Sequence, residues 1–232
     1  LVYWLIKLTD YRFMYMEVKK ANEMKDLFTN MIAHELRAPL TAIRGYASMS
    51  EEIAKNDEEK KYAVRIRESS ERLIAIVNDL LDVARIQSGK LAVVNAEFDV
   101  SKIIVAVTDE LRVSGTEKNI ELIHSGTEEP HVVDGDAKRL HQAMTNLVSN
   151  AIKYTKEGSI ILSVEEKRNK IEIRVKDTGM GISSEDQKKL FAPFFRVEND
   201  DVSQITGTGL GMWITKQLIE LMGAKIGVES IK

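Results

Sequence analysis

A helical pattern with a proline inside it constrains the first part of the chain most strongly. Residues 11–38 contain no glycine or proline, and their apolar side chains recur at the spacing of an amphipathic helix. Pro39 lies inside this pattern, but its ring clashes with the carbonyl group of Glu35 and it has no N–H to donate. We therefore expect a bend within one turn of His34. The apolar positions are Met24, Leu27, Phe28, Met31 and Ile32.

Such a bend would expose the imidazole ring of His34. An unperturbed imidazole has a pKa of about 6.5, so most copies are neutral at slightly alkaline pH and carry a lone pair for attack. Taken alone, a histidine of this kind is far more often an ordinary surface or core residue than a nucleophile. The rest of the chain has to decide between the two interpretations.

A second helical pattern follows a polar, acidic stretch at Lys55 to Lys60, which predicts a turn. Its apolar and small residues recur at alternating three- and four-residue steps, which is typical of a bundle seam. Ser88 and Gly89 indicate its end. Two helices bury little surface alone, so we expect a second copy of the chain to complete a dimeric four-helix bundle. The seam residues are Ala63, Ile66, Ser70, Leu73, Val77, Leu80 and Ala84, extended by Ile76 and Leu81.

The chain changes after Gly89 to short strands and helices in alternation. Asp99 and Asp136 are expected to cap two helices. Alternating apolar residues predict a strand around Ile120 and Leu122 and a hairpin within 159–179, and a helix over 210–222 and a strand over 225–229 complete the pattern. Helices and antiparallel strands in this order predict a two-layer α/β sandwich.

Composition excludes several classes of function. The 232 residues carry a net charge of −3, which gives no support to nucleic-acid binding. The absence of cysteine excludes disulfides, thiolate metal sites and cysteine nucleophiles, and the four scattered histidines do not have the spacing of a zinc site. A metal, if one is bound, should be a hard ion with oxygen ligands.

The opening LVYWLIKLTD is apolar but far shorter than the stretch of about 20 residues that spans a bilayer. It suits either the cytoplasmic edge of a transmembrane helix or the last strand of a sensor domain, and the sequence leaves this choice open. We therefore expect a cytoplasmic protein, or the cytoplasmic portion of a membrane-anchored sensor.

Polar residues form one stripe along the helix DAKRLHQAMTNLVSNAIKYT, so we expect its apolar arc to pack on the sheet and the amides to face outward together. Asparagine disfavours a helix, because its side chain competes for backbone hydrogen bonds. Two asparagines one turn apart on an exposed helix face, Asn146 and Asn150, therefore suggest a function beyond solubility. Amide oxygens suit Mg²⁺, which is commonly held by few protein groups together with substrate phosphates, while Lys153 could face a phosphate. The alternative, a solvated face, would be preferred if the stripe stood alone. Its other members are Arg139 and Gln142.

Two glycine-rich segments accompany this stripe. Asp177 begins DTGMG at the end of a strand, where its carboxylate could accept a hydrogen from the adenine amino group and would refuse guanine. GTGLG, residues 207–211, opens a helix, where free N–H groups favour phosphate. The segment 183–206 between them is expected to be a flexible lid. Each motif alone also has an ordinary interpretation as turn chemistry.

Taken in order, HELRAPL, NLVSNAIKYT, DTGMGI, FAPFFRV and GTGLG resemble the H, N, G1, F and G2 boxes of bacterial sensor histidine kinases. The resemblance covers nearly the whole chain after its first twenty residues. It implies a linker or the end of an upstream sensor or membrane segment over 1–20, a dimerisation and histidine phosphotransfer domain over 21–89, and a catalytic ATP-binding domain of the Bergerat type over 90–232.

The same resemblance implies the activity and the site. The chain would use ATP and Mg²⁺ to phosphorylate His34, with Glu35 as the general base, and then pass the phosphoryl group to an aspartate of a response regulator receiver domain. Asn146 and Asn150 would hold Mg²⁺ and phosphate. The remaining nucleotide-binding residues would be Lys153 and Tyr154 at the phosphates and ribose, Asp177, Gly179 and Gly181 at the adenine, Arg196 at the γ-phosphate, and Gly207, Thr208, Gly209, Leu210 and Gly211 in the lid.

Two departures and one alternative accompany the resemblance. Family members that dephosphorylate their partner usually carry Thr or Asn where this chain has Ala38, which predicts weak phosphatase activity. The family usually continues after Val228 into a glycine-rich turn and a further strand, whereas this sequence stops at Lys232, which predicts either a missing sheet edge or a truncated chain. The alternative is a dimeric scaffold that binds nucleotide without kinase activity. Chaperones, mismatch-repair proteins and gyrase-like ATPases share the nucleotide motifs, but none is expected to carry HELRAPL on a preceding bundle.

Overall fold

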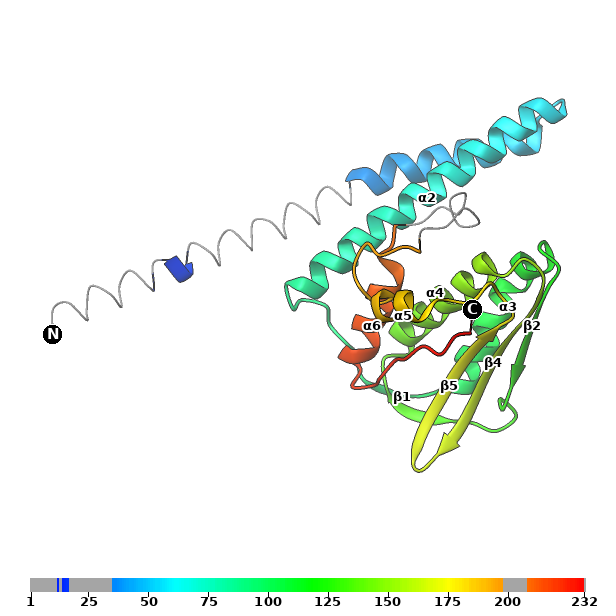
Figure 1. Cartoon of the computed structure of the whole chain (residues 1–232). Coiled ribbons are helices and arrows are strands. Elements are labelled where there is room, and N and C mark those ends of the chain that lie inside the picture. Colours follow the sequence, from blue (N-terminus) through cyan, green and yellow to red (C-terminus); the bar gives the residue numbers. More distant parts are fainter. Residues whose placement is uncertain (1–11, 13, 17–34, 198–207, 232) are drawn as a thin grey trace. The chain divides into compact units, whose positions relative to one another are not determined.

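The computed structural model of the chain describes residues 12, 14–16, 35–197 and 208–231 (Figure 1). It divides into two compact units, Leu1–Leu91 and Ala92–Lys232, which we call the helical unit and the α/β unit. His34, Gly207 and the apolar opening of the chain lie outside the described residues. Within the described ranges, no helix has the length and apolar character needed to cross a membrane.

The helical unit is a hairpin of two helices. Residues 35–53 are helical, Pro39 included, and α2 spans Asp57–Gln87. The turn between them is shorter than predicted, because α2 begins inside the acidic stretch that we expected to be the turn. Asn56 caps the helix by accepting a hydrogen bond from the N–H of Glu59 at 2.8 Å. Three acidic residues lie in the first turn, where the positive end of the helix dipole stabilises negative charge. They therefore stabilise the start of α2 at this position.

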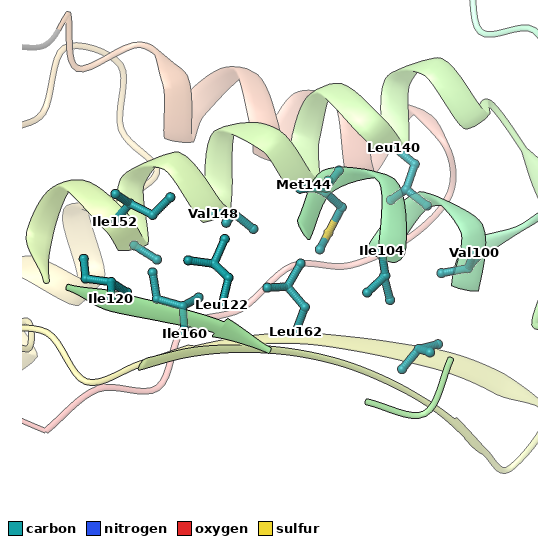
Figure 2. Close-up of a cluster of buried hydrophobic side chains, with 13 residues drawn as sticks. Val100, Ile104, Ile120, Leu122, Leu140, Met144, Val148, Ile152, Ile160 and Leu162 are labelled. Carbon is teal, nitrogen blue, oxygen red and sulfur yellow. The ribbon is translucent and has the colours of Figure 1, made fainter. Parts of the chain in front are cut away.

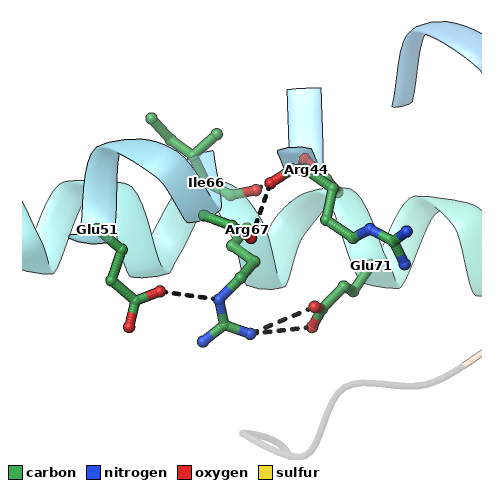
Figure 3. Close-up of polar contacts among 7 residues, drawn as sticks. Arg44, Glu51, Ile66, Arg67 and Glu71 are labelled. Carbon is green, nitrogen blue, oxygen red and sulfur yellow. Dashed lines mark hydrogen bonds and ion pairs between the residues drawn. The ribbon is translucent and has the colours of Figure 1, made fainter. Parts of the chain in front are cut away.

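Contacts between the two helices are both apolar and polar. Leu40 packs against the buried side chains of Val77 and Leu81. At the other end of the hairpin, the guanidinium group of Arg67 donates to Glu51 at 3.0 Å and also contacts Glu71 at 3.2 Å (Figure 3). Glu51 lies in the first helix, so this arginine joins the two helices.

The α/β unit has a three-stranded sheet in the order β2–β4–β5. β2 (Ile120–Ser125) pairs with β4 (Gly158–Lys167) in parallel, and β4 pairs with β5 (Lys170–Asp177) in antiparallel register. The predicted hairpin is therefore confirmed. Two further short strands, β1 (Ala96–Asp99) and β3 (Val132–Gly135), form a separate antiparallel pair that the sequence did not predict.

Helices α3 (Val100–Thr116) and α4 (Ala137–Tyr154) cover one face of the sheet (Figure 2). Alternate residues of β4, namely Ile160, Leu162 and Val164, are buried against Ile104 of α3 and Val148 of α4. This burial supplies the main stabilisation of the unit. The predicted two-layer α/β sandwich is confirmed.

Aspartates begin both helices, as predicted. Asp99 accepts from the N–H of Ser101 and Asp136 from the N–H of Arg139, at 3.0 and 3.1 Å. Asp136 also accepts from the N–H of Val94 at 3.0 Å. Burial by itself would raise the pKa of Asp136, but these backbone hydrogen bonds outweigh it and hold the pKa below its ordinary value.

The end of the chain corrects one prediction. Helix α6 spans Gly211–Leu221, close to the predicted bounds, but residues 225–229 do not form a strand. Ile226 and Val228 are half-buried between exposed neighbours, so the predicted alternation is present. The segment is attached instead through Ser230, whose hydroxyl accepts from the N–H of Ile182 and whose carbonyl accepts from Gln187, at 2.9 Å each.

Candidate nucleotide-binding site

The asparagines of α4 face α6, not open solvent. Asn146 Nδ2 donates to Thr215 Oγ1 at 2.7 Å, and Asn150 Nδ2 lies 3.5 Å from the sulfur of Met212. The apolar arc of α4 packs into the core as predicted, but the outward orientation that we expected for the two amides is wrong. The α6 side chains that contact these amides are one hydroxyl, of Thr215, and one thioether, of Met212.

Lys153 and Tyr154 occupy the last turn of α4. The ammonium group of Lys153 lies 5.4 Å from the centre of the Tyr154 ring, and both side chains are half-buried. Burial, and then the positive charges of Arg196 and Lys118, lower the pKa of Lys153. Burial raises the pKa of Tyr154. A half-buried ammonium group near two other cations favours an anionic ligand, because an anion would relieve the repulsion.

Lys118 supports this turn from outside the predicted motifs. Its ammonium group donates to the carbonyl groups of Ile152 and Lys153 at 3.0 and 3.4 Å. These carbonyls belong to the end of α4, where a cation is favoured by the helix dipole. Sequence reasoning missed this residue, because a lysine in a polar turn carries no local signal of its partner.

Asp177 ends β5 and begins a tight turn. Its Oδ1 accepts from the N–H of Gly179 at 2.9 Å, and its side chain is exposed. A Cβ atom on Gly179 would lie 2.7 Å from that oxygen, 2.8 Å from the carbonyl oxygen of Tyr154 and 3.0 Å from Oγ1 of Thr155. Glycine is therefore required here, and the strand end and the end of α4 meet at this point. Gly181 follows with a φ of 68°.

Thr155, which follows α4, was not predicted to belong to this region. Its hydroxyl oxygen is buried and has no hydrogen-bond partner in the part of the chain that the structure describes. The crowding around Gly179 brings it close to Asp177 without joining them. A buried hydroxyl without a partner is unusual, and this one lies beside the turn that Asp177 begins.

The second glycine-rich segment packs on the F-box segment. Gly209 has a φ of 73°, and a Cβ atom there would lie 2.7 Å from the backbone of Phe194. Phe194 itself has a φ of 63°, a conformation that is strained for a bulky residue. Thr208 Oγ1 accepts from the N–H of Leu210 at 3.2 Å, and Leu210 is buried. The close approach of Gly209 to Phe194 places the start of α6 beside the segment that carries Arg196.

The segment expected to be a lid is only partly described. Its first residues form a short helix, α5 (Ser184–Lys189), capped by Ser183, whose hydroxyl accepts from the N–H of Asp186 at 3.1 Å. Residues 198–207 lie outside the described ranges. The prediction of a flexible lid over 183–206 therefore stays a prediction.

The helical unit contributes the predicted acceptor region. Glu35 and Ala38 are exposed on the helix over 35–53, directly after His34 in the sequence. Arg37 lies on the same helix, and its guanidinium group donates a hydrogen bond to Asn78 Oδ1 of α2 at 2.6 Å. This bond fixes the two helices to each other within a turn of the predicted acceptor.

A divalent cation would have to be held by amide oxygens. No group of three or more His, Cys, Asp or Glu side chains suited to a metal occurs among the described residues. Asn146 and Asn150 present amide groups one helical turn apart, and amide oxygens together with phosphates suit the octahedral preference of Mg²⁺. The donor set therefore fits a nucleotide-bound Mg²⁺ and not a metal site made by protein alone.

The fold and the site define a class of protein: a two-layer α/β ATP-binding domain of the gyrase and histidine kinase type, preceded by a helical hairpin. Comparison with family models agrees. Residues 24–89 match the His Kinase A (phospho-acceptor) domain, and residues 135–232 match the histidine kinase-, DNA gyrase B-, and HSP90-like ATPase.

Known proteins place the chain more narrowly. It is 36% identical over 220 residues to the sensor protein GacS of Pseudomonas syringae pv. syringae, covering 92% of this chain and 24% of that protein. It is 34% identical over 218 residues to the signal transduction histidine-protein kinase BarA of Escherichia coli strain K12, covering 91% of this chain and 24% of BarA. The chain thus spans about a quarter of the length of these relatives.

Solved structures give the same result. The full-length ShkA structure in complex with AMPPNP superimposes with a TM-score of 0.68 at 27% identity, covering 84% of this chain and 41% of that one. The histidine kinase ThkA in complex with the response regulator protein TrrA gives a TM-score of 0.56 at 28% identity, covering 85% and 55%. The chain belongs to the sensor histidine kinases, and it carries the phosphoacceptor and ATPase domains of that family.

Proposed function

We propose that the chain transfers the γ-phosphoryl group of ATP to His34 and then to an aspartate of a response regulator receiver domain. The observation that carries the proposal is that two asparagines and a half-buried lysine lie along the C-terminal half of α4, whose last residue contacts the turn that follows Asp177. Phosphoryl transfer requires mainly positioning and charge neutralisation, and these groups are of the types that supply both.

Each end of the nucleotide has matching chemistry. The exposed Asp177 carboxylate accepts hydrogen bonds and would select the amino group of adenine over the carbonyl of guanine. Asn146 and Asn150 would hold Mg²⁺, and Lys153 with Arg196 would neutralise phosphate charge. Glu35 would take the proton from the attacking imidazole of His34, and Gly207 would belong to the lid.

We infer that the chain acts as a homodimer. Ile66, Leu73 and Leu80 recur at seven-residue steps on α2 and are 50%, 48% and 47% exposed. An apolar row at this spacing is typical of the seam between helices of a bundle, so a second hairpin would bury it. The receiver-domain partner is supported by the response regulator bound to ThkA in the related structure.

Incubation of the full chain with γ-labelled ATP and Mg²⁺ tests the proposal. We expect label that is lost in acid, is stable in alkali, is absent from His34→Gln and moves to a receiver domain added afterwards. Acid-stable label would contradict a phosphohistidine. Nucleotide binding without any label would instead favour the non-catalytic scaffold.

A further inference from the structure

Thr215 joins α6 to the predicted magnesium ligand. It is 1% exposed, and its hydroxyl oxygen accepts the hydrogen bond from Asn146 Nδ2 at 2.7 Å. The two residues are 69 positions apart in the sequence, so only the fold brings them together. A buried hydroxyl and a half-buried amide each need a partner, and here they satisfy one another.

This hydrogen bond engages the donating end of the Asn146 amide. The amide has a donating NH₂ group and an accepting oxygen, and only the oxygen can bind a cation. With Nδ2 bound to Thr215, the oxygen is the end left for a ligand. It lies beside Gly211, where a Cβ atom would come within 2.6 Å of Oδ1 and 3.1 Å of Nδ2, so only glycine leaves room for the amide at this position.

The NH₂ group of Asn150 also contacts α6, but through a weaker interaction. Its Nδ2 lies 3.5 Å from the sulfur of Met212, one turn before Thr215 on α6. A thioether is a weak acceptor, so this contact constrains the amide less than the hydroxyl does. Both contacts come from α6, so one helix orients the NH₂ groups of both amides toward itself.

We propose that Thr215 is a positioning residue that holds the Asn146 amide with its oxygen toward the Mg²⁺ of bound nucleotide. The proposal rests on the proposed ATP and Mg²⁺ chemistry. The terminal torsion of asparagine has two broad minima, so without the hydroxyl the amide can turn and present its NH₂ group to the cation. Residues that orient a metal ligand are typically worth about 10- to 100-fold in metal affinity.

The test compares nucleotide affinity with and without the metal, which separates a metal effect from a general loss of structure. Binding of ADP to the full chain is measured by calorimetry in Mg²⁺ and in EDTA, and the ratio of the two dissociation constants gives the gain due to Mg²⁺. Thr215→Val keeps the shape of the side chain but removes the hydroxyl. Thr215→Ser keeps the hydroxyl.

Thr108 supplies a matched control. It is also fully buried in the α/β unit, but its hydroxyl donates to the carbonyl group of Ile104 within α3 at 2.8 Å. Thr108→Val therefore removes a buried hydroxyl away from the asparagines. Melting temperatures of both valine variants report any common loss of stability.

We expect Thr215→Val to reduce the gain due to Mg²⁺ about tenfold while the affinity in EDTA changes less than about twofold. Thr215→Ser and Thr108→Val should keep the gain of the unchanged chain. An unchanged gain in Thr215→Val, or equal losses in Mg²⁺ and EDTA, would overturn the proposal. If the unchanged chain itself showed no gain due to Mg²⁺, the proposed function would fail, and this inference with it.

Discussion

The two units of the chain satisfy their apolar residues in different ways. The α/β unit buries its large side chains within itself, since Ile104, Ile160 and Leu162 have no exposed surface. The helical unit buries Ala63, Ser70, Val77 and Leu81 of α2, while other large side chains of the same helix stay about half exposed, namely Ile66, Leu73 and Leu80. The first unit therefore has a complete core, and the second has half of one. We therefore expect nucleotide binding to be independent of assembly and the stability of the hairpin to depend on it.

The largest expected effect tests the complete core. Leu162→Ala should lower the free energy of unfolding of the α/β unit by about 3 kcal/mol, because it leaves a cavity where no water or partner can compensate. Urea unfolding at several protein concentrations should give the same value each time. Val113→Ala, at a position that is 68% exposed, should cost less than about 1 kcal/mol. Equal costs for the two variants would show that the core is not closed.

The next effect tests the incomplete core. Leu73→Glu should weaken dimerisation about a hundredfold, or about 2.7 kcal/mol, because it places a charge in the apolar row. Light scattering over a dilution series measures the change. Ala75→Glu adds the same charge at another exposed position of α2 and should leave the dimer intact. A dimer that tolerates Leu73→Glu as well as Ala75→Glu would show that this row is not the seam.

A smaller effect concerns the cap that starts α4. Asp136→Ala removes the acceptor for two backbone N–H groups and should cost about 2 kcal/mol. Because the pKa of Asp136 is lowered in the folded state, its stabilisation is present above the ordinary carboxyl pKa and is lost as pH falls through the lowered value. Thermal melts between neutral and acidic pH should therefore converge for the variant and the unchanged chain. A constant difference at all pH values would contradict the assignment.

The smallest effect has opposite signs in binding and stability. Lys153→Met should weaken ATP binding about tenfold through the lost charge, yet raise the melting temperature slightly. Burial lowers the pKa of Lys153, which means that its charge destabilises the folded state at low and neutral pH, and that this cost is relieved as pH rises from the lowered pKa to the ordinary lysine pKa. Bound phosphate prefers the charged form, so affinity in the unchanged chain should fall as pH rises through the lowered pKa. Lys138→Met, an exposed change on the same helix, should alter neither property.

Local chemistry made much of this fold predictable. Asp99 and Asp136 could be predicted as helix caps, because an aspartate side chain accepts a hydrogen bond from a nearby backbone N–H. The β4–β5 hairpin could be predicted from the alternation of apolar residues on both sides of a short turn. The pair β1–β3 was missed because each strand has only four residues, and its register, such as Phe98 opposite Val133, joins distant segments. Residues 225–229 show the reverse case, since alternation fixes which side chains are buried but does not supply a hydrogen-bonding partner strand.

The candidate site also has a part that could be predicted from the sequence and a part that could not. Motif residues such as Asn146, Asp177 and Gly179 could be named from their order along the chain. Their supports could not, because Thr215 and Lys118 act through side-chain contacts across 69 and 34 positions. The orientation of the asparagines was predicted wrongly for the same reason: helical periodicity gives a face but not what covers it.

In the proposed function, the α/β unit binds the nucleotide and His34 of the helical unit receives its phosphoryl group. One paired measurement tests it directly, with nucleotide affinity and acid-labile label determined on the same preparations of two variants. His34→Gln should bind ATP like the unchanged chain and take up no label, while Asp177→Asn should lose both binding and label and remain a dimer. Label on His34→Gln, or normal ATP affinity in Asp177→Asn, would contradict the account.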